Sequence, residues 1–461
     1  MRLTHFFYSL IMISLGYILS VGSSGCGQVG MPTGGSKDTI PPRLLNASPG
    51  LQSTNVTGNK ITLTFNEYVE IKDAQTNVLI SPYPKKTPSV DHKLKTVTVK
   101  LKDTLLPNTT YSINFGNAIV DINEGNPLKD FTYVFSTGSN IDSLMLSGKV
   151  IIAETGKPDS TLMALLYRNA DDSAVQKRKP DYLTKLSGNG SFVFINLPPG
   201  NFKVYALKDG DGGKTYNSKK ELFAFADAPV TVSENTEAVT LYASAFEKEK
   251  LVTTQKSTVS KKLVITYSPG MQLQDLISPF ELSFNNPLKD FEPSKLILTD
   301  TNAVPIPATT WSIDSSRTKI SLAVNWQEEK QYRLIIDTAA IADSAGNHLA
   351  KSDTVQFTTK KQADYANVVL RFTNLDLTRH PVLQFVQGEE IKNSYRLTTT
   401  EWSNKLMPPG DFDIRILYDD NNNGKWDPVD YSSKLQPEKA ITLPEKLNLK
   451  ANWDNERDIK L

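Results

Sequence analysis

Short segments in which apolar and polar residues alternate recur along most of the chain. Residues 60–66 read KITLTFN, residues 96–101 read TVTVKL and residues 110–115 read TYSINF. Alternation of this kind places every second side chain on one face, which predicts a half-buried β-strand. Val, Ile, Thr, Tyr and Phe fill these segments, and Pro, Gly, Asn and Asp separate them. We find no long segment of helical periodicity, so the pattern predicts an all-β fold.

Longer patterns occur twice in the chain. Residues 197–214 read LPPGNFKVYALKDGDGGK, and residues 407–425 read MPPGDFDIRILYDDNNNGK. The strand at 60–66 has an echo in FELSFNN at 280–286, the strand at 110–115 has one in QYRLII at 331–336, and residues 119–126 have one in IADSAGN at 341–347. A chain of 461 residues is long enough for several domains. The repeats predict two copies of a two-domain unit.

The N-terminus has the layout of an export signal. Arg2 precedes a nearly continuous apolar run at residues 6–21, and small residues at 22–25 precede Cys26. This layout favours a signal peptide of residues 1–25 over a membrane-spanning helix. It resembles a bacterial lipoprotein signal, with Ser23 where that family usually has Leu or Val. The resemblance implies a diacylglycerol on Cys26, and the Gly-, Thr- and Pro-rich residues 26–42 are predicted to form a lipidated tether.

The larger domain of each unit resembles the bacterial Ig-like domain of S-layer and cell-envelope proteins. The resemblance is carried by FNE at 65–67, TYSI at 110–113, IVD at 119–121 followed by EGN at 124–126, and FST at 135–137. It implies β-sandwiches at residues 43–138 and 263–360. Asp121 and Asn126 are predicted to cap a loop between strands, with a ligand-binding role as the alternative.

The smaller domain of each unit resembles the transthyretin-like sandwich of carboxypeptidase regulatory and collagen-binding B-type domains. SGNGSFVF at 187–194 and LPPGNF at 197–202 carry the resemblance. It implies sandwiches at residues 142–245 and 365–461. The charged, Thr- and Ser-rich residues 246–262 are predicted to form the linker between the two units. The first half of 365–461 shows too little pattern to place its strands. The predicted fold is therefore an all-β tandem array of Ig-like and transthyretin-like sandwiches.

Composition narrows the classes of function. The net charge is +1, whereas nucleic-acid binding usually requires a basic excess. Cys26 is the only cysteine, so no disulfide forms within the chain. Four scattered histidines have no zinc-ligand spacing, and no nucleophile elbow or phosphate loop occurs. These features predict a protein that is not an enzyme.

One loop has the spacing of a calcium site. Asp419, Asn421, Asn423 and Gly424 match the D-x-N-x-N-G pattern, with Asp427 and Asp430 near the ninth and twelfth positions. Alternate residues of a tight loop direct their oxygens at one centre, and calcium takes oxygen ligands. The candidate cofactor is therefore calcium. The alternative is a solvated turn, because Asn and Asp are common in long hairpin loops.

The equivalent loop of the first unit has fewer ligand residues. Asp209 and Asp211 remain, and Glu221 is the third candidate ligand. Gly212 and Gly213 replace side chains that carry oxygen in the other loop. The sequence makes this the weaker of the two candidate metal sites.

Asp-Ser and Asp-Thr tripeptides recur and resemble the O-glycosylation acceptor of exported Bacteroidota proteins. The alternative is that these pairs favour turns and strand starts. The candidate acceptors are Thr39, Thr104, Ser143, Ser160, Ser173, Thr338, Ser344 and Thr354.

The whole chain resembles an Ig-like-domain lipoprotein of the Bacteroidota envelope. The leading hypothesis is a non-enzymatic scaffold, anchored by lipid to the outer membrane and binding an unidentified envelope protein or glycan. One alternative is a carbohydrate- or protein-capturing lipoprotein of a nutrient-uptake system, for which Trp402, Trp426 and Trp453 would supply an aromatic platform. A remote alternative is a hydrolase with dispersed carboxylates. In Bacteroidota lipoproteins, acidic residues directly after the cysteine resemble a signal for surface export. Residues 27–30 are uncharged here, so the resemblance implies the periplasmic face.

Overall fold

The computed structural model describes residues 37–247, 262–268, 273–307 and 310–461, together with Met12. Apart from Met12, the predicted signal peptide lies outside the described residues, as do Cys26, most of the tether and most of the linker. The chain divides into two compact units. The first unit extends to Ile80 and includes Lys86–Asn140, and the second comprises Ser81–Lys85 and Ile141–Leu461. No helix in the described part of the chain is long and apolar enough to cross a membrane.

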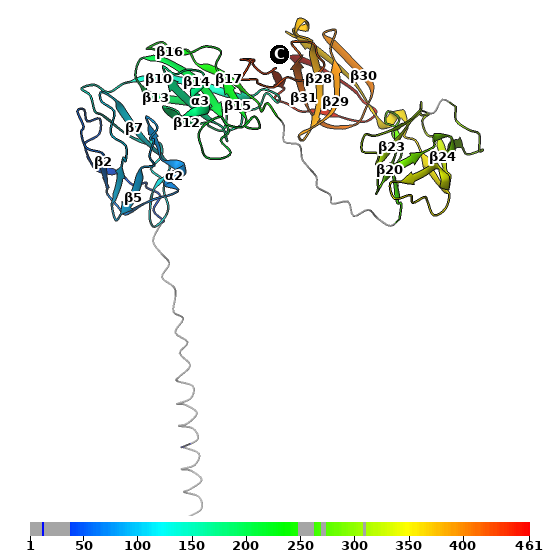
Figure 1. Ribbon diagram of the computed structural model, residues 1–461, viewed down its shortest axis with the longest axis horizontal. Helices are drawn as coiled ribbons and strands as arrows, with labels where there is room; N and C mark the ends of the chain where they lie inside the picture. The colour runs from blue at the N-terminus through cyan, green and yellow to red at the C-terminus, as the bar shows by residue number, and fades with distance from the viewer. Residues whose placement is uncertain (1–11, 13–36, 248–261, 269–272, 308–309) are drawn as a thin grey trace, which may run out of the picture. The chain divides into compact units, whose positions relative to one another are not determined.

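The first Ig-like module is a sandwich of antiparallel strands (Figure 1). One sheet has the order β1 (Leu44–Ser48), β2 (Lys60–Phe65), β6 (Thr96–Lys100) and β5 (Ser89–Lys93). A second sheet has the order β4 (Leu79–Ser81), β7 (Thr110–Gly116) and β9 (Phe131–Ser136). In a third, β3 (Val69–Ile71) pairs with β8 (Ile119–Asp121). Alternation along β2 directs Ile61, Leu63 and Phe65 inward, where each is at most 1% exposed. The predicted strand pattern is therefore what fills this core.

The second Ig-like module repeats the same order. Its first sheet has the order β18 (Ile265–Ser268), β19 (Phe280–Phe284), β23 (Lys319–Ala323) and β22 (Thr310–Ile313). The second has the order β21 (Leu296–Asp300), β24 (Gln331–Ile336) and β26 (Asp353–Thr358). In the third, β20 (Leu288–Phe291) pairs with β25 (Ile341–Asp343). Each strand has one counterpart in the first module, in the same position of the same sheet. The duplication predicted from sequence thus extends to the topology.

The first small sandwich packs a sheet of three strands on a larger one. The smaller sheet is β13 (Ser191–Leu197), β10 (Leu144–Ile152), β17 (Val239–Ala243), and the larger is β12 (Tyr182–Lys185), β11 (Met163–Arg168), β14 (Gly200–Leu207), with β15 (Phe223–Phe225) and β16 (Val230–Val232) both pairing with β14. The first and last strands, β10 and β17, pair in parallel. Gly148 of β10 is needed for this packing, because a Cβ there would lie 2.3 Å from the Val239 carbonyl oxygen.

The second small sandwich has the same arrangement, with a parallel pair formed by its first and last strands. The smaller sheet has the order β30 (Glu401–Met407), β27 (Ala366–Thr373) and β34 (Asp454–Lys460). The larger sheet has the order β29 (Glu390–Arg396), β28 (Pro381–Gln387) and β31 (Gly410–Tyr418), and both β32 (Ala440–Thr442) and β33 (Leu447–Leu449) pair with β31. The strands that the sequence left unplaced are β27 to β30. Two of them, β29 and β30, lie at sheet edges and are largely polar, which hides their periodicity.

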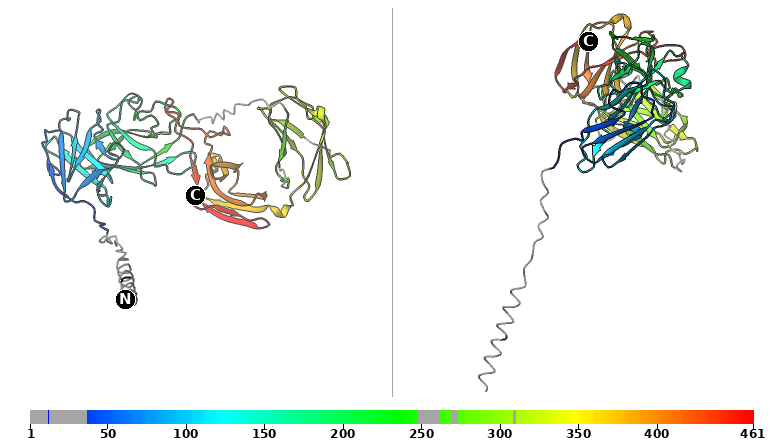
Figure 2. Two further views of the ribbon diagram at one scale, coloured as in Figure 1. Left: turned by 90° about the horizontal axis from the view of Figure 1, so that it is seen from below. Right: turned by 90° about the vertical axis from the view of Figure 1, so that its left-hand side faces the viewer.

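The predicted all-β tandem array is confirmed (Figures 1 and 2). Helix in the described residues is confined to short segments, including α2 (Ala74–Asn77) and α3 (Ala174–Lys177). Each of the four modules has its own hydrophobic cluster.

Candidate functional site

Two equivalent aspartates, Asp121 and Asp343, are fully engaged by their own loops. The carboxylate of Asp121 accepts hydrogen bonds from the backbone N–H groups of Glu124, Gly125 and Asn126 at 2.6–2.9 Å. These contacts agree with the predicted capping role. A carboxylate that already accepts three backbone hydrogen bonds has little capacity left for a ligand.

Asp343 is the counterpart of Asp121 in the second Ig-like module. It is fully buried, and it accepts bonds from the amide side chains of Asn286 and Asn347 and from two backbone N–H groups. Burial alone would raise the pKa of Asp343, but the hydrogen bonds outweigh it and lower this pKa to about 2. Its charge is therefore stabilised by neutral donors.

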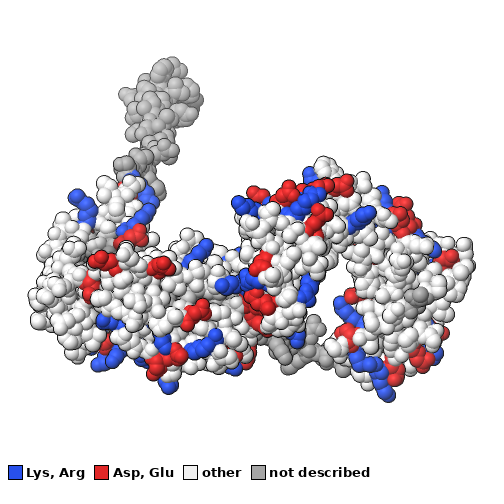
Figure 3. Space-filling model, turned by 90° about the horizontal axis from the view of Figure 1, so that it is seen from above, with Lys and Arg blue, Asp and Glu red and all other residues white. Residues whose placement is uncertain are grey.

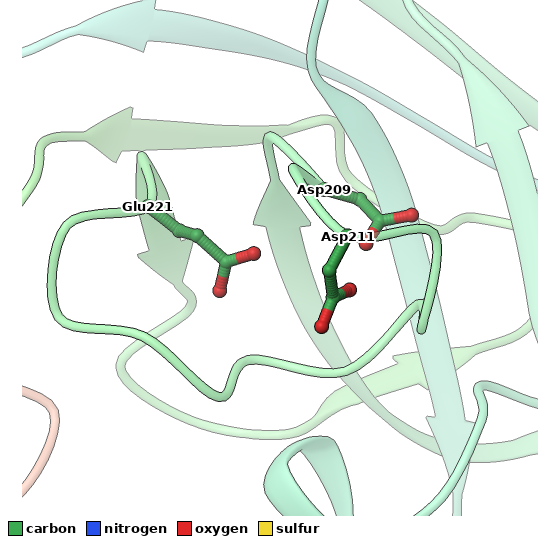
Figure 4. A group of neighbouring side chains, drawn as sticks. All are labelled: Asp209, Asp211 and Glu221. Atoms are coloured by element: carbon green, nitrogen blue, oxygen red, sulfur yellow. The ribbon is translucent and has the colours of Figure 1, made fainter.

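The first acidic loop runs from the end of β14 to the start of β15. Asp209, Asp211 and Glu221 each offer an oxygen within 4.8 Å of the others, and Figure 4 shows the three side chains gathered within the loop. Theirs is the only such group of three in the described part of the chain. The structure therefore brings together the residues of the site that the sequence ranked second.

The first acidic loop also contains its own cation. The ammonium of Lys214 forms an ion pair with Asp209, whose side chain is fully buried. Backbone N–H groups and the Asn217 amide satisfy the two other carboxylates: Gly213 and Asn217 donate to Asp211, and Asn217 and Ser218 donate to Glu221. The negative charge of these three carboxylates is thus stabilised by Lys214 and by neutral hydrogen-bond donors.

The second acidic loop comes after β31, and its candidate ligand residues form hydrogen bonds with one another and with the loop backbone. Asp419, which is 3% exposed, accepts bonds from the backbone N–H groups of Asn423 and Gly424 at 3.1 and 3.0 Å. Gly424 has φ +75°, which provides the sharp turn. The side-chain amides of Asn421 and Asn423 both donate to Oδ2 of Asp427. Four of the five predicted ligand residues therefore lie in one hydrogen-bonded loop.

Asp430, the fifth predicted ligand, lies in a different turn. Its carboxylate accepts bonds from the hydroxyls of Ser432 and Ser433 and from the Ser432 N–H. Between it and Asp427, Val429 is fully buried, and the Val429 N–H donates to Ser244. This anchored residue separates Asp430 from the other four.

Glu438 is a residue of the second acidic loop that sequence spacing did not identify. Its Oε2 accepts a bond from the Asp427 N–H at 3.0 Å, and its backbone carbonyl accepts one from the Trp426 indole at 3.0 Å. Its Oε1 is buried without a hydrogen-bond partner. Burial raises the pKa of Glu438, and the charges of Asp427 and Asp419 raise it further. No local motif points to this glutamate, which reaches the loop only through the fold.

The segment 429–442, which we call the docking segment, connects the two small sandwiches. The hydroxyl of Tyr431 lies 2.9 Å from that of Tyr205 and donates to the Asp172 carbonyl. Its ring contacts an aromatic cluster of the first sandwich, formed by Tyr205, Tyr216, Phe223 and Phe225. The Ala440 N–H donates to the Ala153 carbonyl at 2.8 Å. The second acidic loop thus leads directly into an interface.

The remaining candidates lie at the surface to different extents. Of the candidate acceptors for O-glycosylation, six are exposed and two, Ser173 and Thr338, are half-buried. Trp402 packs against Phe385 and Tyr395, Trp426 is bonded to Glu438, and only Trp453 of the three is exposed. Each tryptophan has its own neighbours, and the structure does not gather them into one platform.

Comparisons with known proteins identify the larger modules. No curated protein matches the chain. Among solved structures, the N-terminal part of the bacterial S-layer protein SbsC is 17% identical, with 45% of each chain covered and a TM-score of 0.16. BcpA, the major pilin subunit of Bacillus cereus, is 10% identical over 70% of this chain and 99% of its own, with a TM-score of 0.17. A DUF3823 family protein from Bacteroides uniformis is 11% identical over 47% of this chain and 99% of its own, with a TM-score of 0.14.

TM-scores of this size carry no inference about fold or function. The match to a family model is separate from them and covers two stretches of the chain. Residues 38–137 and 260–359 both match the model of the bacterial Ig-like domain, so the chain contains two copies of that domain.

Proposed function

We propose that the protein is a non-enzymatic, lipid-anchored scaffold of a bacterial cell envelope. The observation that carries this proposal is the alternation of two bacterial Ig-like domains with two small sandwiches of one topology. Tandem sandwiches have separate, stable cores, and such modules serve as spacers and binding surfaces. Basic and acidic side chains are interspersed on the face drawn in Figure 3, which fits a protein or glycan partner better than a nucleic acid.

The proposed attachment is through lipid on Cys26. A charged start, an apolar run and small residues before the sole cysteine support it. Two or more acyl chains give stable anchoring, whereas one chain is marginal. The proposed location is the outer membrane with the domains on the periplasmic side.

The Cys26→Ala variant tests the anchor. We expect the wild-type protein to sediment with membranes after a carbonate wash and to incorporate labelled palmitate, and the variant to do neither. Ser24→Ala is the matched control, because it leaves the cysteine in place. A Cys26→Ala protein that still sediments after the wash would exclude a lipid anchor at this residue.

Protease added to intact cells tests the location. We expect the second Ig-like domain to resist digestion until the outer membrane is permeabilised. Digestion of intact cells would instead place the domains on the cell surface and favour capture of an external glycan or protein.

A further inference from the structure

The second acidic loop holds more negative charge than it compensates. Asp419 and Glu438 are 3% and 6% exposed, and Asp427 is half-buried beside them. Within the described residues, none of these three carboxylates forms an ion pair with Lys or Arg. Burial of several carboxylates side by side is unfavourable unless hydrogen-bond donors or a positive charge compensate all of them.

The first acidic loop shows how the same position is neutralised elsewhere in the chain. There Lys214 comes after Gly213 and pairs with the buried Asp209. In the second loop the lysine after the glycine is Lys425, which is exposed and has no ion pair among the described residues. The second loop therefore lacks the internal cation that the first contains.

Glu438 provides an independent observation of a missing partner. Its carboxylate is held against the loop by the Asp427 N–H, which bonds to Oε2, while Oε1 is buried and has no partner. A buried carboxylate oxygen without a partner is rare in folded proteins and points to a ligand or ion. The loop also borders a hollow of about 580 Å³. Asn421, Asp427 and Glu438 line it together with Arg379 and Lys439.

We propose that Asp419, Asp427 and Glu438 bind a divalent cation, with Asn421 and Asn423 as further ligands. All of these ligands provide oxygen, and an all-oxygen set with three carboxylates fits calcium. Rotation of the two Asn amides presents their oxygens where their nitrogens now bond to Asp427. Unlike the carboxylates of the first loop, these three are not all within 4.8 Å of one another, so binding draws them inward. Oε1 of Glu438 has no hydrogen bond to break in that movement.

The position of the ligands gives the cation a structural consequence. Asp427 and Glu438 enclose residues 428–437, the part of the loop and docking segment that contains Tyr431. A cation shared by both carboxylates fixes the two ends of this stretch, and binding to the docked state stabilises docking by linkage. The proposal is independent of the lipid anchor, because it concerns the loop and the docking segment alone.

The direct test is calorimetric titration of the purified, chelator-treated chain with calcium chloride. We expect wild-type protein to bind calcium and Glu438→Gln to bind it at least about tenfold more weakly, since the loss of a charged ligand lowers calcium affinity. Asp430→Asn is the matched control and should bind within about twofold of wild type, because Asp430 faces its own serines. Circular dichroism in chelator verifies that each variant is folded.

Limited proteolysis provides a second readout. Calcium should slow cleavage within residues 428–437 in wild-type protein and should have no such effect on Glu438→Gln. Absence of binding heat at millimolar calcium in the wild type would overturn the proposal. Equal affinity of Glu438→Gln and wild type would remove Glu438 from the site, and loss of binding in Asp209→Asn alone would assign calcium to the first loop instead.

Discussion

The two acidic loops occupy equivalent places in duplicated sandwiches, yet they handle their charge in different ways. The first has fewer candidate ligands, but its three carboxylates converge and Lys214 pairs with one of them. The second has the denser motif, but Asp419 is bonded to backbone N–H groups and Asp430 to its own turn. The number of oxygen-bearing residues in a loop therefore does not predict whether their oxygens meet.

The two loops also lead into different parts of the fold. The first leads to Glu221 and then to β15 within its own sandwich, whereas the second continues into the docking segment. The duplicated loop has thus acquired contacts with the first sandwich, and its local chemistry is linked to them. Tyr431 is the centre of those contacts.

Of the substitutions considered, replacement of Tyr431 should have the largest effect on the contact between the two small sandwiches. Tyr431→Ala removes a side chain that is 6% exposed, and a buried aromatic truncated to Ala costs about 3–5 kcal/mol. Because the small sandwiches would lose the aromatic part of their shared contacts, we expect their unfolding transitions to separate in differential scanning calorimetry. Tyr431→Phe keeps the ring and loses only hydrogen bonds, so its effect should be about 1 kcal/mol. A Tyr431→Ala trace identical to wild type would show that the contacts do not stabilise the chain.

Asp343 is a third kind of buried carboxylate, because only neutral donors stabilise its charge. Its folded pKa of about 2 lies below the unfolded value of about 3.9, so the charged form contributes about 2–3 kcal/mol of stability. That contribution is present above pH ~4 and is lost as the pH falls toward ~2. Asp343→Asn should therefore be less stable than wild type at pH 7, with a difference that shrinks below pH ~4. Urea unfolding across this range is the measurement, with Ser344→Ala as a control expected to show no change.

Replacing Lys214 tests whether this lysine compensates the buried carboxylate charge of the first loop, as the proposed cation does in the second. Lys214→Met leaves Asp209 buried without its ion-pair partner, and since the lysine is partly exposed we expect a loss of about 2 kcal/mol. Calcium should restore part of this loss, because the three carboxylates already converge. Lys425→Met is the matched substitution in the second loop and should change the unfolding free energy by less than about 0.5 kcal/mol. Equal effects of the two substitutions in urea unfolding would contradict the comparison.

Local sequence determined much of the architecture. The alternation in residues 60–66 predicts β2 because period two is what a half-buried strand requires. The repeat of IVD and EGN as IAD and AGN predicted equivalent capped loops, because an aspartate bonds to the N–H groups a few residues after it. The same local reasoning failed on β29 and β30, whose polar edges show little periodicity.

The completion of the second acidic loop and its attachment to the first sandwich depend on contacts between distant segments. Glu438 returns to Asp427 across an anchored segment, and Tyr431 meets Tyr205 from 226 residues away. Neither contact leaves a periodic trace, because each depends on the path of a long loop and on which side chains another module presents there. Sequence determines where strands and turns form, since these depend on neighbouring residues; burial and charge compensation are settled when distant segments pack together.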